Sequence, residues 1–271
     1  MIAEVPPSTG APIAGAGPHG PAPVAEAAEA LFGLNGAIAV TLTGSRALGD
    51  ARPDSDWDLA IYYRSSADAI DPAEVRSLGY SGYVSEPGEW GPVMNGGAWL
   101  TVGGLAIDVI YRDLDLVEAW MGEAEAGCFE VLPQSGSLAG APTYSPMGEL
   151  ASCRTIHGEI SRPVFPERLS STAPALWDRR CALALAFAEI HATRADAVPC
   201  SGMLAVAVLC AGHARMAERS EWVLSEKRLV ERAGLEGAAE AMPVAVGTGR
   251  GLGSCVADVS ERLGARPFAL R

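Results

Sequence analysis

Two aspartates follow a Gly-Ser pair in the stretch TGSRALGDARPDSDWDLAIYY, residues 43–63. Asp56 and Asp58 are two positions apart, and in a β-strand such residues point to the same face. The alternate positions form the opposite face and are all apolar: Trp57, Leu59, Ile61 and Tyr63. Neighbouring carboxylates repel each other unless a cation lies between them. The spacing therefore predicts a strand that carries a cation site on one face and contacts the core with the other.

A third aspartate has a similar setting. Asp108 stands inside the apolar run LAIDVIY, between Ile107 and Val109, which point to the opposite strand face. A buried charge without a partner is costly, so three aspartates on one sheet face favour a hard cation. Ligation by oxygen alone suits Mg²⁺, which keeps waters and takes other ligands from substrate phosphates. The alternative is that Asp56 and Asp58 are solvent-facing residues of an edge strand.

The Gly-Ser pair comes directly after the apolar run GAIAVTLT, which predicts a buried strand that enters a turn. Gly44 allows the main chain to approach a ligand closely, and the Ser45 hydroxyl and backbone amides can face a phosphate. Arg46 would add a positive charge. The alternative is an ordinary turn with Ser45 as a helix N-cap, and both interpretations can hold at once.

Together these motifs resemble a known signature. A Gly-Ser pair, ten residues and then DWDL, followed by a strand with Asp108, is similar to the nucleotidyltransferase signature of the DNA polymerase β-like superfamily. The helical second half resembles antibiotic nucleotidyltransferases, such as those acting on kanamycin, streptomycin or lincosamides. The specific motifs cover residues 43–113, and beyond them the resemblance is one of architecture.

The resemblance implies an activity and a set of site residues. Gly44 and Ser45 would hold the triphosphate, Asp56 and Asp58 would bind Mg²⁺, and Asp108 would complete the triad. The reaction would move a nucleoside monophosphate from an NTP, expected to be ATP, to a hydroxyl of a small molecule, with two Mg²⁺ ions at the site. Pyrophosphate would leave, as in other two-metal sites. The general base is either Asp108 or a separate glutamate, for which the candidates are Glu86, Glu89, Glu149 and Glu159.

Lys227 is the only lysine in a chain with 19 arginines. A compact ammonium on a flexible stem suits a point contact to a phosphate, and similar enzymes place a lysine of the helical domain over the triphosphate. Ser225 is the expected N-cap of its helix, which would put Lys227 in the first turn. The alternative is a lysine that survives by chance on a solvated helix face.

The periodicity predicts an α+β fold. We expect a flexible Pro- and Gly-rich tail over residues 1–23, and a nucleotidyltransferase domain with a mixed sheet and flanking helices over 24–140. A C-terminal helical bundle should follow over 141–271. The pattern indicates a hairpin about Gly103 and Gly104, a long loop over 86–97, a linker over 132–146, and no strand after Met147.

Charge and cysteine content limit the partners. Residues 1–150 contain 5 Arg against 20 Asp and Glu, whereas residues 151–271 contain 14 Arg and one Lys against 13 acids. An acidic first half disfavours nucleic acid and favours a cationic acceptor such as an aminoglycoside, which we expect to bind between the two domains. Six scattered cysteines predict free thiols in a reducing compartment. Neither a signal peptide nor a membrane span is expected, so the predicted location is the cytoplasm.

Two other functions fit the same motifs. One is a nucleotidyltransferase that modifies a protein or RNA, as toxin–antitoxin relatives do; the acidic charge and the long helical half disfavour it. The other is a nucleotide-binding protein without transferase activity, which the intact aspartate trio disfavours.

Overall fold

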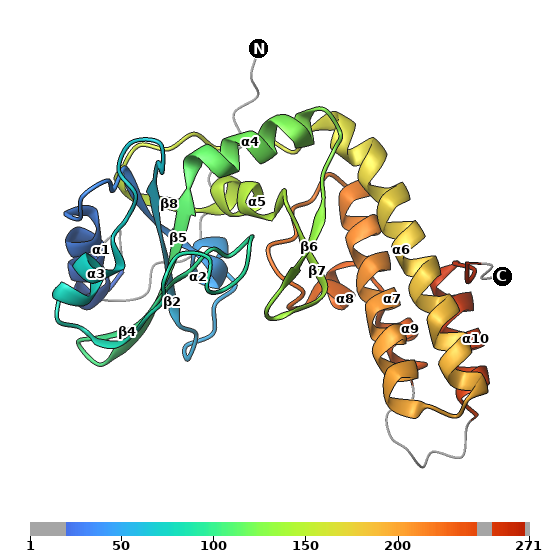
Figure 1. The fold of residues 1–271 in the computed structure, drawn as a ribbon. Coiled ribbons are helices and arrows are strands. Elements are labelled where there is room, and N and C mark those ends of the chain that lie inside the picture. The colour runs from blue at the N-terminus through green and yellow to red at the C-terminus, as the bar shows by residue number, and fades with distance from the viewer. Residues whose placement is uncertain (1–19, 243–250, 269–271) are drawn as a thin grey trace. The chain divides into compact units, whose positions relative to one another are not determined.

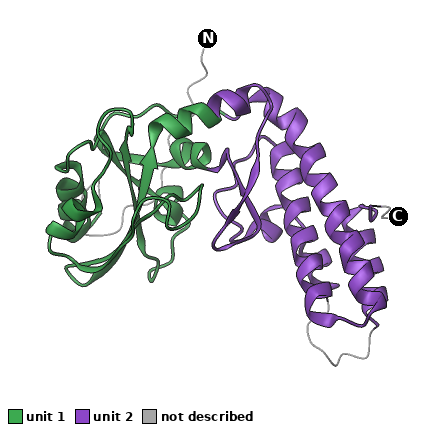
Figure 2. Cartoon of the chain, in the orientation of Figure 1, with its two compact units in different colours: residues 1–120, 146–164 green, residues 121–145, 165–271 purple. Residues whose placement is uncertain are grey.

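The computed structural model describes residues 20–242 and 251–268. The chain divides into two compact units (Figure 2). Unit 1 comprises residues 1–120 and 146–164, and unit 2 comprises residues 121–145 and 165–271. This division differs from the expected boundary at residue 140, because the chain enters unit 2 at residue 121 and returns to unit 1 at residue 146. Most of the predicted tail, residues 1–19, lies outside the described residues.

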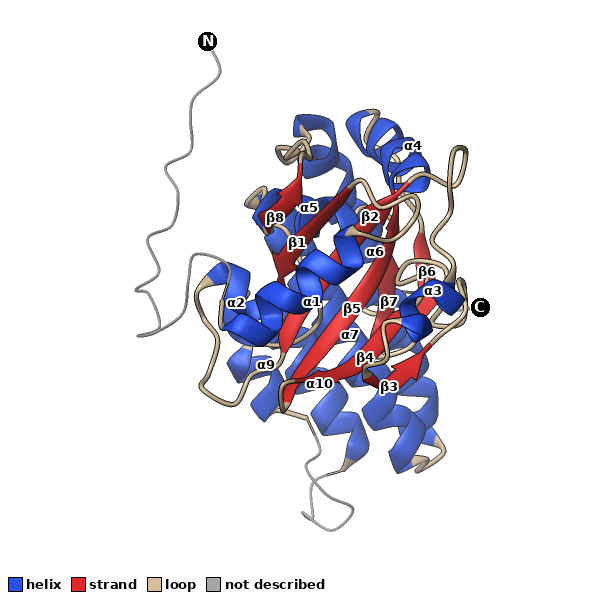
Figure 3. Ribbon diagram, turned by 90° about the vertical axis from the view of Figure 1, so that its left-hand side faces the viewer, coloured by secondary structure: helices blue, strands red, loops and turns tan. Residues whose placement is uncertain are grey.

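Unit 1 is built on a six-stranded mixed sheet (Figures 1 and 3). Its strands have the order β3-β4-β5-β2-β1-β8, and β2 and β5 are the parallel pair among antiparallel neighbours. Its elements in chain order are α1 (Ala22–Phe32), β1 (Ala39–Thr43), α2 (Gly44–Leu48), β2 (Trp57–Tyr63), α3 (Pro72–Ser77), β3 (Ser81–Val84), β4 (Gly97–Val102), β5 (Leu105–Asp113), α4 (Leu114–Glu125), α5 (Ser145–Ser152) and β8 (Arg154–Gly158). Helix α4 runs from unit 1 into unit 2.

The core of unit 1 lies on one face of this sheet. Helix α1 lies across β1, β2 and β5 (Figure 3) and buries apolar residues at three- and four-residue spacing: Val24, Ala27, Ala28 and Leu31. Each strand contributes alternate residues to the same cluster, and those of β2 are Trp57, Leu59, Ile61 and Tyr63. The predicted apolar face of β2 is therefore confirmed. Burying these side chains removes apolar area from water, which is the main driving force for folding.

Unit 2 combines a hairpin with helices. Its elements are β6 (Val131–Gln134), β7 (Ser137–Pro142), α6 (Glu167–Thr193), α7 (Ala197–Glu218), α8 (Leu229–Arg232), α9 (Glu236–Glu240) and α10 (Leu252–Leu263). Helices α6 and α7 form a long pair joined by a short loop, with α10 packed on α6 (Figure 1). Trp177 and Leu185 of α6 and Leu204 and Met216 of α7 are fully buried. The predicted α+β fold, with a mixed sheet followed by packed helices, is confirmed.

Several element predictions are wrong in detail. The expected linker over residues 132–146 forms the hairpin of β6 and β7. No strand was expected after Met147, but α5 ends at Ser152 and β8 then pairs with β1 as an edge strand of the sheet. Strand β3 was not predicted, and the helix expected from Ser225 begins only at Leu229. The hairpin of β4 and β5 and the loop before it are confirmed.

Helix α7 is long and apolar enough, by length and composition, to cross a membrane. The length and composition of this helix therefore do not by themselves support the expectation that the chain has no membrane span. Half of its most apolar 18-residue window is buried within the protein, as in the core helix of a soluble fold, so the composition is weak evidence for a span. All six cysteines are free thiols, and Cys128 is the exposed one.

Candidate active site

Strands β2 and β5 bring two carboxylates together. Asp58 is the direct partner of Asp108 in the parallel register. Their neighbours point to the core on the opposite face, so both carboxylates project from the face that α1 does not cover. Adjacent strands are about 4.8 Å apart. The structure therefore places Asp58 and Asp108 side by side, both partly exposed.

Gly44 lies directly against Asp58. Thr43, the last residue of β1, is the register partner of Asp58, and α2 begins at the next residue. Gly44 has a φ of +64°, and a Cβ at this position would lie 2.1 Å from Oδ2 of Asp58. Only glycine allows the chain to turn here while the carboxylate stays in place. Ser45 follows as a half-buried residue of α2, and the N-cap position belongs to Thr43 rather than Ser45.

Asp56 and Arg46 lie at the entrance to β2. Asp56 precedes the strand by one residue and is exposed. The Arg46 Nε donates to the Asp56 carbonyl at 3.0 Å, and its Nη2 donates to the Ser55 carbonyl. The guanidinium also lies 4.1 Å from the centre of the Trp57 ring. Arg46 therefore holds this segment against the end of β1, and its contact with a phosphate stays a prediction.

The donor set fits a magnesium ion bound in part by its substrate. Among the residues described, no group of three or more His, Cys, Asp or Glu side chains is gathered closely enough to form a cage for a metal ion. Asp58 and Asp108 offer a pair of carboxylate oxygens, and Asp56 directly precedes β2 in the chain. Mg²⁺ is usually held by one or two carboxylates together with waters and substrate phosphates, so such a pair is sufficient. The coordination shell of a bound Mg²⁺ would thus be complete only when the nucleotide is bound as well.

A buried ion pair occupies the same sheet face further along the strands. Arg112 of β5 donates to both carboxylate oxygens of Glu149 in α5, at 2.9 and 2.7 Å, and Tyr62 donates to the same carboxylate at 3.2 Å. Burial and the Glu149 charge raise the pKa of Tyr62 well above its usual value. Glu149 is therefore committed to a structural contact and is a poor candidate for the general base.

The other three glutamates considered for the general base either contact other side chains or lie outside the strands that carry Asp58 and Asp108. Glu86 forms an ion pair with Arg76 at 2.5 Å. Glu89 accepts a hydrogen bond from the Tyr83 hydroxyl, and Glu159 lies just past the end of β8. Asp108 is the candidate that shares a sheet face and a register position with Asp58.

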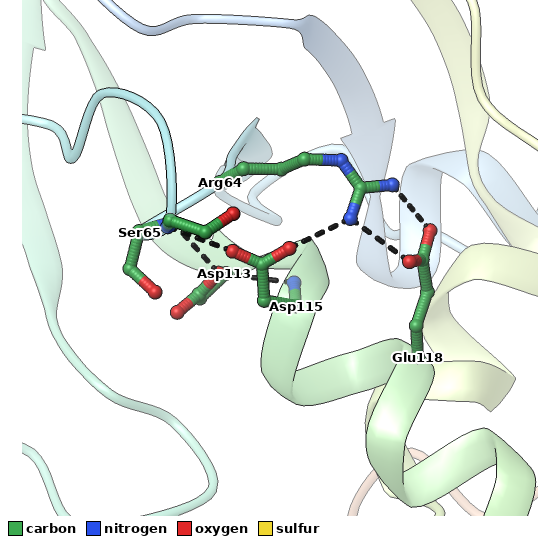
Figure 4. Close-up of polar contacts among 6 residues, drawn as sticks. Arg64, Ser65, Asp113, Asp115 and Glu118 are labelled. Atoms are coloured by element: carbon green, nitrogen blue, oxygen red, sulfur yellow. Dashed lines mark hydrogen bonds and ion pairs between the residues drawn. The ribbon is translucent and has the colours of Figure 1, made fainter.

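The ends of β2 and β5 are held together by a separate cluster, shown in Figure 4. Arg64, just after β2, contacts Asp115 at 2.8 Å and Glu118 at 2.5 Å, both in the first turns of α4. The Ser65 main-chain N–H donates to Asp113, the last residue of β5, at 3.2 Å. The Ser66 main-chain N–H donates to Asp115 at 2.8 Å, and hydrogen bonding from Ser66, followed by that from Arg64, lowers the pKa of Asp115 to about 2. The cluster fixes the β2–β5 register that brings the two aspartates together.

One straight row of register partners crosses the sheet through the carboxylates. In spatial order it contains Thr43, Asp58, Asp108, Trp99 and Tyr83. The two aromatic members were not predicted. A signal was present in the sequence, because a two-residue Gly-Gly turn fixes the register of its hairpin and places Trp99 opposite Asp108.

Lys227 lies in unit 2, in the turn that precedes α8. Its side chain is exposed, and its main-chain N–H donates to the Ser225 hydroxyl at 3.4 Å. Arg228 occupies the N-cap position, so the expected first-turn location is wrong. Its contact with phosphate stays a prediction.

The comparisons with known proteins bear on the matched part of the sheet. Residues 24–94 match the family model of the nucleotidyltransferase domain. This segment of the chain is therefore similar to a nucleotidyltransferase domain. The match includes Gly44, Ser45, Asp56 and Asp58, whereas Asp108 lies beyond it. Among curated proteins, none matches this chain.

A solved structure is also similar at low identity. It is the nucleotidyltransferase-like protein from Exiguobacterium sibiricum, with a TM-score of 0.43 and 8% sequence identity. The alignment covers 87% of this chain and 71% of that chain.

Proposed function

We propose that this protein transfers a nucleoside monophosphate from an NTP to a hydroxyl of a small, cationic acceptor. The observation that carries the proposal is the register pairing of Asp58 with Asp108 beside Gly44. This arrangement places the turn at Gly44, where the main chain can approach a phosphate closely, next to two carboxylates that suit a divalent cation. Domains of the matched family act on an NTP with a divalent metal, and ATP is the nucleotide we expect.

The chain's own residues have defined tasks in this reaction. The main chain at Gly44 and the Ser45 hydroxyl would hold the triphosphate, and the carboxylates of Asp58 and Asp108 would hold Mg²⁺. The acceptor oxygen bonds to the α-phosphorus as the bond to the β-phosphate oxygen breaks, and pyrophosphate leaves. The hydroxyl proton passes to the Asp108 carboxylate. Bound Mg²⁺ supplies neutralisation of the charge that develops on the phosphate oxygens.

The charge of unit 1 supports a cationic acceptor. This unit contains 18 Asp and Glu against 7 Arg. An acidic surface attracts small cations and repels nucleic-acid backbones. We therefore propose an aminoglycoside-like antibiotic as the acceptor class, and the cytoplasm as the location, where NTPs and Mg²⁺ are available.

The test is a pyrophosphate-release assay with each NTP and a panel of aminoglycosides, lincosamides, neutral sugars, RNA and protein. The wild-type protein should release pyrophosphate with an aminoglycoside and Mg²⁺, and chelation should stop the reaction. Asp58→Asn and Asp108→Asn should each lower kcat about 100-fold or more, because each removes metal-binding charge, with little change in thermal stability. Asp54→Asn, at an exposed site before β2, is the control and should keep full activity. Transfer only to RNA or protein, or full activity in Asp58→Asn, would contradict the proposal.

A further inference from the structure

Two aromatic side chains share the sheet face of Asp108, and a third, from the loop before β4, stacks on one of them. Trp99 is the register partner of Asp108, and Tyr83 is the register partner of Trp99. The Tyr83 and Trp99 rings are 5.5 Å apart, and Trp90 stacks on Trp99 at 4.9 Å with an interplanar angle of 18°. We call Tyr83, Trp90 and Trp99 the aromatic shelf.

The aromatic shelf packs against strand β4 through Trp90, while Trp99 and Tyr83 are exposed to solvent. A Cβ on Gly97 would lie 2.8 Å from the Trp90 ring, so Trp90 packs directly on the backbone of β4. Trp99 is nevertheless 53% exposed and Tyr83 is 40% exposed. Aromatic rings of this size normally lie buried and dominate the energetics of interfaces. Rings fixed in place and left open to solvent are typical of a ligand-binding surface rather than of a core.

The shelf has a definite position relative to the reaction. The row across the sheet places Gly44 beyond Asp58 on one side and Trp99 beyond Asp108 on the other. In phosphoryl transfer the attacking and leaving oxygens lie roughly in line on opposite sides of the phosphorus. If the leaving pyrophosphate is held at Gly44, the attacking hydroxyl must come from the Asp108 side. Trp99 is about one strand spacing, or ~4.8 Å, beyond Asp108.

The charge around the shelf favours a cation. The Glu89 carboxylate accepts hydrogen bonds from the Tyr83 hydroxyl and, at 2.9 Å, from the Glu86 main-chain N–H. These contacts hold the pKa of Glu89 below its usual value, so the group stays ionised. The nearby Arg76 is paired with Glu86. Aromatic faces also attract ammonium groups, so ring and carboxylate act on the same ligand class.

We propose that the aromatic shelf is the acceptor subsite, and that it binds one ring of an amino sugar. The C–H face of the ring would lie on Trp99, its ammonium would point to Glu89, and its hydroxyl would point to Asp108. The assignment of the shelf to the acceptor rests on the proposed transfer function, whereas binding to the shelf can be measured without turnover.

Calorimetric titration with kanamycin, without nucleotide, tests the binding step alone. Trp99→Ala should raise the Kd about tenfold, while Trp99→Phe should keep most of the affinity. Trp99→Leu has an apolar side chain but no π-face. It replaces Trp99→Ala in this titration if the alanine variant unfolds. Phe187→Ala removes an aromatic side chain of similar exposure (42%) from α6, and its Kd should not change.

Steady-state kinetics then separate the two substrates. Trp99→Ala should raise the KM for kanamycin about tenfold and leave the KM for the NTP within twofold. A rise in the NTP KM instead would mean that the shelf binds the nucleobase, and would overturn the proposal. Failure of the wild-type protein to bind kanamycin, or equal Kd values for Trp99→Ala and Phe187→Ala, would overturn it as well. Binding through Trp99 without pyrophosphate release would leave the subsite standing and refute the proposed transferase function.

Discussion

Gly44 is the residue whose replacement would disturb the candidate site most directly. Its positive φ and its contact with the Asp58 carboxylate are two separate demands, and a side chain violates both. We expect Gly44→Ala to cost about 1–2 kcal/mol of stability through backbone strain and to abolish transfer, because the new methyl group must displace Asp58. Chemical denaturation and pyrophosphate release would measure the two effects.

The hairpin turn provides the matched control for this change. Gly104 has a φ of +81°, and a Cβ there would meet no atom within 4 Å. Gly104→Ala should therefore lose similar stability through strain and keep its activity. If both variants lost activity to the same extent, strain alone would explain the effect and the contact with Asp58 would be irrelevant.

The buried Arg112–Glu149 ion pair holds helix α5 against the sheet face that carries Asp58 and Asp108. It joins β5 to α5, and the two side chains are only 4% and 9% exposed. Removing one member leaves the other charge buried, which typically costs about 3–5 kcal/mol. We expect Glu149→Gln to lower the free energy of unfolding by this amount, as measured by urea denaturation. Replacing the exposed Glu231, paired with Arg228, should have little effect.

A double replacement separates structure from catalysis at this position. Arg112→Met with Glu149→Leu removes both charges, so it should recover most of the lost stability. If Glu149 were the general base, the double variant would be stable and inactive. We expect it to be stable and active.

How far the sequence predicts these elements depends on local signals. The hairpin of β4 and β5 was predictable because its strands are apolar and its Gly-Gly turn has positive φ at both residues. Strand β8 has the polar sequence RTIHG and follows a helix directly, so only pairing with β1 reveals it. The hairpin of β6 and β7 contains Pro and Gly and resembles a linker.

The same limit applies to the site. Asp58 and Asp108 share a face because strand alternation is encoded in the sequence, and this part was predictable. The commitment of Glu149 to Arg112 was not, because residues 37 positions apart meet only through the fold. The location of Lys227 before α8 depends on Arg228 at positive φ, which no sequence pattern indicated.

Helix α7 carries a pH-sensitive group in the core of unit 2. The His213 ring stacks on Trp177 at 4.1 Å, and neither ring nitrogen has a hydrogen-bond partner. Burial, and secondarily the charge of Arg180, lower its pKa to about 3. The unfolded chain would bind this proton near pH 6.5. The unfolded state therefore holds more protons between about pH 3 and 6.5, and stability must fall as the pH is lowered through this window.

Denaturation curves at several pH values would measure this effect. One proton corresponds to a slope of at most about 1.4 kcal/mol per pH unit. We expect His213→Phe to flatten the slope without a loss of hydrogen bonds, whereas His191→Phe near the end of α6 should retain it. An unchanged slope in His213→Phe would show that other groups control the acid sensitivity.

At the scale of the whole molecule, negative charge is concentrated in the unit that contains the carboxylate pair. Unit 1 has a net charge of −11 and unit 2 of −2, counting Lys, Arg, Asp and Glu by unit. Bound Mg²⁺ and NTP bring charges that largely cancel, so the surroundings of the site stay acidic during turnover. The acidic field should therefore steer cationic acceptors toward unit 1.

Salt provides the test of this steering. The Debye length falls from about 10 Å at 0.1 M to about 3 Å at 1 M ionic strength, so attraction over distances longer than direct contact is lost. We expect kcat/KM for an aminoglycoside to fall at least about fivefold between 0.05 and 0.5 M NaCl. A neutral sugar acceptor, measured in parallel, should show little change, because salt would then act only through the nucleotide. Equal salt dependence for the two acceptors would refute electrostatic steering and assign the acidic charge of unit 1 to solubility alone.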